Sequence, residues 1–167
     1  ASAHPVKFRN GVLKKFLNDG GYYHSNVNVL NIDGDCESVS IETEQGTISA
    51  EACVIAANAY SPLFSDFFKS RELVDPFRGQ IITSKPLNHD FKFKHPHSFD
   101  HGYEYALVTE DNRLLIGGWR DHSTTKEMGT YSLETNPMIE EGLKEFAQNH
   151  YEIAEKIEWE FSTISGR

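Results

Sequence analysis

The sequence predicts an α+β fold, with an amino-terminal helix and a small β-meander preceding a larger, mostly antiparallel sheet that carries one late helix. Three observations support this prediction. Apolar residues recur at helical spacing in two segments, residues 5–19 and 137–147. Other segments alternate apolar and polar residues or form short apolar runs, as strands do. Turn-forming pairs such as Asp33-Gly34 and Gln45-Gly46 separate neighbouring strand-like runs.

Composition limits the class of protein. The 167 residues are 38% hydrophobic and carry a formal net charge of -9, so a nucleic-acid backbone would be repelled. The two cysteines, Cys36 and Cys53, are too few for a disulfide framework and indicate a reducing compartment. The sequence has no apolar run near the roughly 20 residues that span a bilayer and no signal-like start. We therefore expect a cytoplasmic protein that binds neither membrane nor nucleic acid.

The first part of the chain contains the predicted helix and meander. Pro5 suits the first turn of the helix, and Gly20-Gly21 ends it. Residues 22–32, 38–43 and 47–49 read as three strands of the meander. Residues 52–57 form a continuous apolar run, which predicts a strand that is buried on both faces and needs neighbours on both sides. Residues 58–69 read as a short helix or an irregular turn.

The sequence pattern changes near Arg71, where long strand-like runs begin, so we divide the chain into residues 1–70 and 71–167. Long strand-like runs occupy residues 74–84, 99–109 and 113–119, and residues 157–164 read as a closing strand. Residues 85–98 mix Pro, Asn, Asp, Lys and His and should be a loop. The late helix opens at Asn136-Pro137, and its apolar positions share one face.

Metal, nucleophile and phosphate sites find little support in the sequence. His95, His97, Asp100 and His101 lie close together, but Pro96 favours extended backbone, on which adjacent side chains diverge. We interpret this stretch as a solvated loop and predict no metal site. A nucleophile elbow and a glycine-rich phosphate loop are both missing from the sequence, so no catalytic residue is identified.

Two features favour a binding pocket. The run at residues 54–60 ends a predicted strand in small residues, where a ligand can approach the backbone. The second feature is a group of aromatic and basic residues on neighbouring strands, namely Tyr103, Tyr105, Trp119, Arg78 and Arg120. Aromatic rings with guanidinium groups enclose small organic acids or amines, but a sheet face packed on a helix has the same composition, and both interpretations remain open. His101, beside the start of a strand, is a further candidate for lining the pocket.

A series of short motifs resembles a known family. In order along the chain they are His4-Pro-Val-Lys-Phe-Arg9, Gly20-Gly-Tyr-Tyr23, Asn28-Val-Leu-Asn-Ile32, Gln45-Gly-Thr-Ile-Ser-Ala50, Cys53-Val-Ile-Ala-Ala-Asn-Ala-Tyr60, Pro76-Phe-Arg-Gly-Gln80 and Arg113-Leu-Leu-Ile-Gly-Gly118. Together they resemble the middle of the FAD-dependent D-amino-acid oxidase superfamily, which includes glycine oxidase, sarcosine oxidase and gamma-glutamylputrescine oxidoreductase. The resemblance covers nearly the whole chain and rests on the order and spacing of the motifs.

The resemblance implies a role for each part of the chain. Residues 1–70 would be a partial FAD-binding domain, and residues 71–167 would be a substrate-binding sheet that roofs the flavin. The implied cofactor-binding residues are Val29, Ala56, Ala57, Asn58 and Tyr60, with Asn58 standing where glycine is usual and Tyr60 replacing a common tryptophan. The expected substrate-binding residues are Tyr105, whose position the resemblance supports, and Tyr103, Arg78, His101 and Trp119.

The chain also departs from the family pattern. The glycine fingerprint that binds the FAD pyrophosphate is absent from this sequence. The family's substrate-carboxylate arginine would fall near Thr163, with Arg167 as a substitute only if the turn differs. We therefore interpret the chain as the central fragment of a larger flavoprotein.

The resemblance further implies an activity. The parent enzyme would oxidise a C–N bond of a small amine or amino acid, moving a hydride from the adjacent C–H to the flavin and leaving an imine that hydrolyses. The fragment alone should be inactive. The predicted strand at residues 53–57 would lose its sheet neighbours and expose an apolar edge, so we expect self-association, or poor order before about Arg71. The alternative is a stand-alone binding or oligomerisation module without catalysis.

Overall fold

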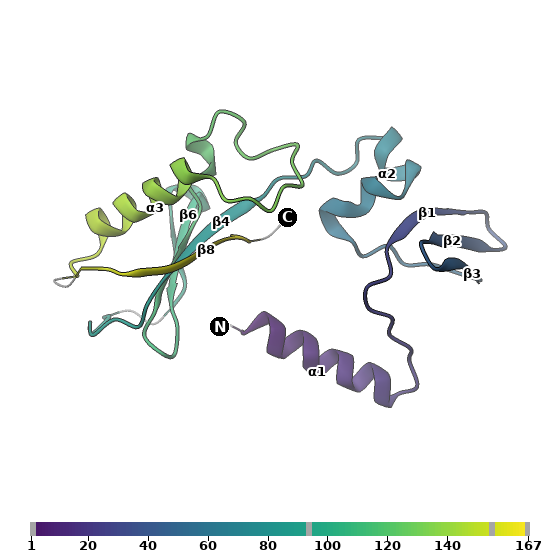
Figure 1. The fold of residues 1–167 in the computed structure, drawn as a ribbon, viewed down its shortest axis with the longest axis horizontal. Helices are drawn as coiled ribbons and strands as arrows, with labels where there is room; N and C mark the ends of the chain where they lie inside the picture. Colours follow the sequence, from purple (N-terminus) through teal and green to yellow (C-terminus); the bar gives the residue numbers. More distant parts are fainter. Residues whose placement is uncertain (1–2, 93–94, 154–155, 166–167) are drawn as a thin grey trace. The chain divides into compact units, whose positions relative to one another are not determined.

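The computed structural model describes residues 3–92, 95–153 and 156–165, which form two compact units. The amino-terminal unit comprises the described residues up to Val74, and the carboxyl-terminal unit those from Asp75 (Figure 1). Within the described residues no helix is both long enough and apolar enough to cross a membrane.

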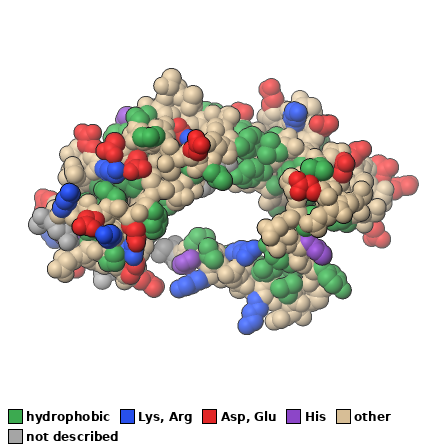
Figure 2. All heavy atoms as spheres, in the orientation of Figure 1, with side chains coloured by type: hydrophobic (Ala, Val, Ile, Leu, Met, Phe, Trp, Pro, Cys, Tyr) green, Lys and Arg blue, Asp and Glu red, His purple; other side chains and the backbone are tan. Residues whose placement is uncertain are grey.

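The amino-terminal unit begins with helix α1 (Pro5–Asn18), as the sequence predicts. The His4 ring accepts a hydrogen bond from the Lys7 backbone N–H, and Pro5 occupies the first turn. The chain leaves the helix at Gly20, whose φ of +92° is easily adopted only without a side chain. No residue of α1 is buried. Figure 2 shows basic and hydrophobic side chains together on the visible surface of this helix.

The predicted meander is confirmed. Strands β1 (Val29–Gly34), β2 (Val39–Thr43) and β3 (Gly46–Ala50) form a three-stranded antiparallel sheet in that order. Its first turn is held by the Asp35 carboxylate, which accepts hydrogen bonds from the backbone N–H groups of Glu37 and Ser38 at 2.8 and 3.0 Å. The first strand is shorter than predicted and starts at Val29.

The buried strand predicted at residues 52–57 is not formed. The segment carries no strand pairing, and Val54 is 89% exposed. An apolar run is buried as a strand only where partner strands lie on both sides, and none of the described residues supplies one for it. The chain continues through the 3₁₀ helix η1 (Asn58–Leu63) and the short helix α2 (Asp66–Ser70), in agreement with the expected irregular helical segment.

The carboxyl-terminal unit is built on a five-stranded antiparallel sheet. Its strands are β4 (Gly79–Ser84), β5 (His97–Phe99), β6 (Glu104–Val108), β7 (Leu114–Gly117) and β8 (Trp159–Ser165), in the spatial order β5-β6-β7-β4-β8. Every neighbouring pair is antiparallel, as predicted. Strand β5 corrects the sequence prediction, because it lies partly within the expected loop at residues 85–98, where pairing with β6 outweighs a loop-like composition.

Helix α3 (Pro137–His150) covers one face of this sheet (Figure 1). The Asn136 side chain caps it by accepting a hydrogen bond from the Met138 N–H at 3.1 Å. The fully buried apolar residues between helix and sheet are Ile82, Leu114, Ile116, Ile139, Leu143 and Ala147. Since side chains alternate along a strand, the residues between these core positions face the other side of the sheet.

Candidate functional site

A pocket of about 460 Å³ lies in the carboxyl-terminal unit, at one end of the sheet. Its lining combines aromatic rings, glycines, one guanidinium and three hydroxyl groups, from Phe77, Gly79, Gly102, Tyr103, Tyr105, Gly118, Arg120 and Ser165. Tyr103 and Tyr105 were both predicted from the sequence as substrate-binding residues, and the structure brings them together in this pocket.

Strand alternation positions Tyr105. Glu104 and Ala106 are buried on the side of α3, so Tyr105 between them faces the opposite side of the sheet. Tyr105 is paired in register with Gly117 of β7, and a Cβ at Gly117 would collide with the tyrosine ring. The missing side chain at Gly117 thus lets the ring lie across β7. The Tyr105 hydroxyl reaches within 3.3 Å of Ser165 Oγ on β8.

Arg120 supplies the positive charge of the pocket. It opens the 3₁₀ helix η3 (Arg120–His122), and its guanidinium carbon lies 4.5 Å from the Phe77 ring centroid and 5.4 Å from the Tyr103 ring centroid. One guanidinium nitrogen donates to the Lys126 carbonyl at 3.4 Å. None of the ion pairs found among the described residues involves this arginine. The guanidinium therefore keeps donors for an anionic ligand while the two rings fix its plane.

Arg78, also predicted as a substrate-binding residue, lies outside the pocket lining. Its Nε donates to Glu127 Oε2 at 2.5 Å, and its Nη1 donates to the carbonyl oxygens of Ser132 and Glu134 at 2.8 and 2.7 Å. The side chain is 10% exposed. These bonds fasten the loop before α3, so in this structure the guanidinium is used to hold the fold together.

Trp119 faces away from Tyr105. Gly118 and Trp119 both have positive φ, +121° and +64°, so the chain turns out of the β7 direction before it reaches the indole. The Trp119 ring stacks on His122, with ring centroids 4.1 Å apart, and also packs on α3, where a Cβ at Gly142 would overlap it. The sequence placed Trp119 with the tyrosines, and this turn separates them.

The other expected substrate-side residues are not in the pocket lining. His101 is exposed in the 3₁₀ helix η2 (Asp100–Gly102), with a φ of +55°. Thr163 is exposed on β8, two residues before the pocket residue Ser165. Arg167, the expected substitute for a carboxylate-binding arginine, lies outside the described residues.

The amino-terminal unit has a hollow of its own, of about 410 Å³. It is lined by residues of β1, of the following turn, of the start of β2 and of the segments after the meander, namely Asn31, Ile32, Asp33, Gly34, Asp35, Val39, Cys53, Ile55, Ser65, Asp66 and Phe67. None of the predicted cofactor-binding residues belongs to this lining. Val29 begins β1, Ala56 and Ala57 lie in the unpaired segment, Asn58 begins η1, and Tyr60 is 38% exposed.

These residues are spread over β1, the unpaired segment and η1, and they do not line the hollow of this unit. The 167 residues contain no Gly-x-Gly-x-x-Gly run of the kind that holds a pyrophosphate. Asn58, which was expected to stand where glycine is usual, has a φ of +49°, a conformation that glycine adopts freely and asparagine tolerates. We derive no redox step from these residues.

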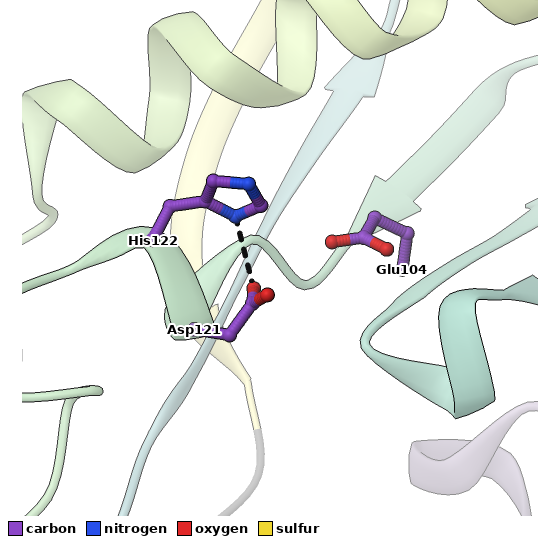
Figure 3. A group of neighbouring side chains, drawn as sticks. All are labelled: Glu104, Asp121 and His122. Carbon is purple, nitrogen blue, oxygen red and sulfur yellow. Dashed lines mark hydrogen bonds and ion pairs between the residues drawn. The ribbon is translucent and has the colours of Figure 1, made fainter.

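A polar cluster lies on the opposite side of β6 from Tyr105 (Figure 3). Glu104 is 3% exposed, and burial, with the nearby charges of Asp121 and Asp100, raises the pKa of its carboxyl group. Asp121 Oδ1 lies 3.0 Å from His122 Nδ1. The sequence analysis missed this cluster, although a glutamate on the same face as the buried Ala106 was a signal for it.

One family profile matches nearly the whole chain. The profile of the family described as FAD dependent oxidoreductase matches residues 1–166. The chain belongs to this family.

Solved structures agree with this assignment at the level of the fold. Glycine oxidase from Bacillus cereus ATCC 14579 is 17% identical over 87% of this chain, with a TM-score of 0.67. Glycine oxidase from Geobacillus kaustophilus is 21% identical over 87%, with a TM-score of 0.63. L-proline dehydrogenase from P. horikoshii is 13% identical over 97%, with a TM-score of 0.69.

This FAD dependent oxidoreductase chain spans less than half of the length of those proteins. It covers 38%, 37% and 43% of the three chains. At identities of this size the likeness establishes a shared fold, and the substrate has to be argued from the pocket itself.

Proposed function

We propose that the carboxyl-terminal unit is the substrate-binding part of an FAD dependent oxidoreductase that oxidises a C–N bond of a small amine or amino acid. The observation that carries this proposal is the placement of Arg120 between Phe77 and Tyr103, in one pocket with Tyr105. A fixed guanidinium beside aromatic rings suits a small molecule with a carboxylate and a short apolar body. The glycine oxidases and the L-proline dehydrogenase that share this fold are named for amino acids.

Each pocket residue has a binding role in this proposal. Arg120 holds the substrate carboxylate, and the rings of Phe77 and Tyr103 keep the guanidinium in plane. The hydroxyls of Tyr105 and Ser165 orient the amine end. FAD supplies the electron acceptor when it is bound. We further propose that residues 1–70 contribute part of the cofactor wall and residues 71–167 the substrate sheet, and that the 167-residue chain alone is inactive.

Calorimetric titration of small ligands tests the pocket. Glycine and L-proline should bind, whereas methylamine and pyrrolidine, which lack the carboxylate, should bind at least about tenfold more weakly. Arg120→Gln should weaken the amino acids by a similar factor, since a hydrogen bond to a charged group contributes about 1.5–3 kcal/mol.

A matched control is available in the amino-terminal unit. Arg71 lies 4.3 Å from the Phe67 ring centroid, so Arg71→Gln also removes a guanidinium stacked on an aromatic ring. This variant should bind the amino acids as the wild type does. Equal weakening by both substitutions, or equal binding of ligands with and without a carboxylate, would refute the proposed pocket.

The inactivity of the isolated chain has its own test. FAD added to the purified protein should remain unbound and show the spectrum of the free flavin. Tight binding with a shifted flavin spectrum, followed by amine-dependent reduction, would contradict this part of the proposal.

A further inference from the structure

Three potential metal ligands meet on the α3 side of the sheet. Glu104 comes from β6, and Asp121 and His122 come from η3. Each offers one ligand atom, and these atoms all lie within 4.8 Å of one another. Figure 3 shows the Glu104 carboxylate facing Asp121 and the His122 ring across a gap. The cluster is distinct from the pocket, which lies on the other face of β6.

One oxygen of the Glu104 carboxylate lacks a partner within this cluster, although the carboxylate also accepts a hydrogen bond from the Trp119 backbone N–H. The residue is 3% exposed, and among the described residues its Oε1 has no hydrogen-bond partner. Carboxylates are rarely buried unless a cation or several hydrogen-bond donors compensate the charge. The carboxylates of Asp121 and Asp100 add further negative charge near this site. A bound cation would supply the missing partner.

The other two proposed ligands, Asp121 and His122, are accessible to solvent, and their side chains can rotate. The side chains of His122 and Asp121 are 48% and 24% exposed, so an ion can enter from solvent. Ligand atoms about 2.0–2.2 Å from a tetrahedral zinc ion lie roughly 3.4 Å from each other. Closing a spread of up to 4.8 Å therefore requires a contraction of up to about 1.4 Å, which rotation of two partly exposed side chains can provide.

We propose that Glu104, Asp121 and His122 form a three-ligand site for a divalent transition-metal cation such as zinc. One imidazole nitrogen with two carboxylates is a zinc-type donor set, whereas magnesium and calcium prefer oxygen ligands throughout. The two carboxylates balance the charge of the ion. Three protein ligands leave one position for water.

The site would have a structural consequence for the pocket. Arg120 is the first residue of η3, and Tyr105 follows Glu104 on β6. A cation shared by η3 and β6 would fasten together the two elements that carry these pocket residues. Metal binding itself does not depend on the proposed function, because it is measured without any amine or amino acid.

Zinc titration of the metal-free 167-residue protein tests the proposal. Isothermal titration calorimetry should give one zinc per chain, and the thermal midpoint should rise with zinc concentration. Cobalt should replace zinc and give the visible absorption of a tetrahedral Co²⁺ ion. Glu104→Gln and His122→Ala should each weaken zinc at least about tenfold. Asp121→Asn, which removes the charge of the third ligand, should also weaken zinc binding. Circular dichroism verifies that each variant is folded.

Two controls remove the same kinds of side chain elsewhere in this unit. Asp90 and His101 are exposed and lie outside the cluster, so Asp90→Asn and His101→Ala should bind zinc as the wild type does. Absence of zinc binding, or binding that survives in Glu104→Gln and His122→Ala, overturns the proposal. Calcium binding as tight as zinc would overturn the assignment to transition metals.

Discussion

Tyr151 shows how burial of one ionisable group makes stability depend on pH. It follows α3 directly, is 8% exposed, and its hydroxyl oxygen lies 2.7 Å from His97 Nε2. Burial raises the pKa of the phenol from 10.0 to about 12. The folded state therefore favours the neutral phenol.

The sign of the pH effect follows from proton binding. Between about pH 10 and 12 the folded chain holds a proton on Tyr151 that the unfolded chain has lost, so the free energy of unfolding falls as pH rises through this window. The loss should reach about 2–3 kcal/mol at most. Tyr151→Phe cannot ionise, so urea unfolding at about pH 9 and 11.5 should show a smaller decline for the variant. Parallel declines would contradict this explanation.

The pair of Arg78 and Glu127 should be far more important for stability than the surface pairs. Both side chains are at most 10% exposed. Glu127→Gln leaves a buried guanidinium without its counter-charge and should lower the free energy of unfolding by about 3–5 kcal/mol. Both tryptophans, Trp119 and Trp159, lie in the carboxyl-terminal unit, so their fluorescence in urea reports on it.

Glu141 provides the control for this prediction. It pairs with Lys144 at 2.8 Å, but its side chain is 73% exposed. Glu141→Gln should change the free energy of unfolding by less than about 1 kcal/mol. A similar cost for both substitutions would mean that the buried pair has no special role.

At the scale of elements, two helical glycines should respond in opposite ways to alanine. A Cβ at Gly142 of α3 would overlap the Trp119 indole, whereas a Cβ at Gly11 of α1 meets nothing within 4 Å. Alanine normally stabilises a helix by up to about 1 kcal/mol relative to glycine. Gly11→Ala should therefore increase helicity measured by circular dichroism, while Gly142→Ala should lower unfolding stability by about 1–3 kcal/mol through overpacking. Stabilisation by Gly142→Ala would show that the indole moves aside easily.

The elements best predicted from sequence are those with local signals. Asn136 and Pro137 mark the start of α3 because capping is decided within one turn. The apolar run at residues 52–57 lacked such a signal, since a buried strand depends on neighbours that the run itself does not contain. Strand β5 was missed for the converse reason, because its three residues are ordered by pairing with β6.

Only part of the pocket was predictable from the sequence. Tyr103 and Tyr105 are two positions apart, so their nearness was predictable, but Tyr103 precedes β6 in helical backbone conformation and only the structure shows that it lines the same pocket. Trp119 could not be assigned from the pattern, because the positive φ at Gly118 and at Trp119 itself redirects the chain. The choice between Arg78 and Arg120 also needed the structure, since only tertiary contacts show which guanidinium is already bonded.

For the whole molecule, exposed apolar surface in the amino-terminal unit predicts self-association. Val54 is 89% exposed, and along α1 Phe8 and Val12 are 70% and 55% exposed. Sedimentation velocity should show the weight-average mass rising with protein concentration. Phe8→Ser with Val12→Ser should reduce this rise, whereas Lys7→Ser with Lys14→Ser, on the same helix, should not. A monomer at all concentrations would contradict the prediction.

The pocket of the carboxyl-terminal unit is the proposed binding place of a small amino acid. NMR titration of the uniformly ¹⁵N-labelled chain with glycine or L-proline tests this most directly. We expect concentration-dependent shifts centred on the backbone amides of Tyr103, Tyr105, Gly118 and Arg120. Arg120→Gln should abolish these shifts. Shifts confined to other parts of the chain, or no shifts at millimolar ligand, would show that the amino acid does not bind in this pocket.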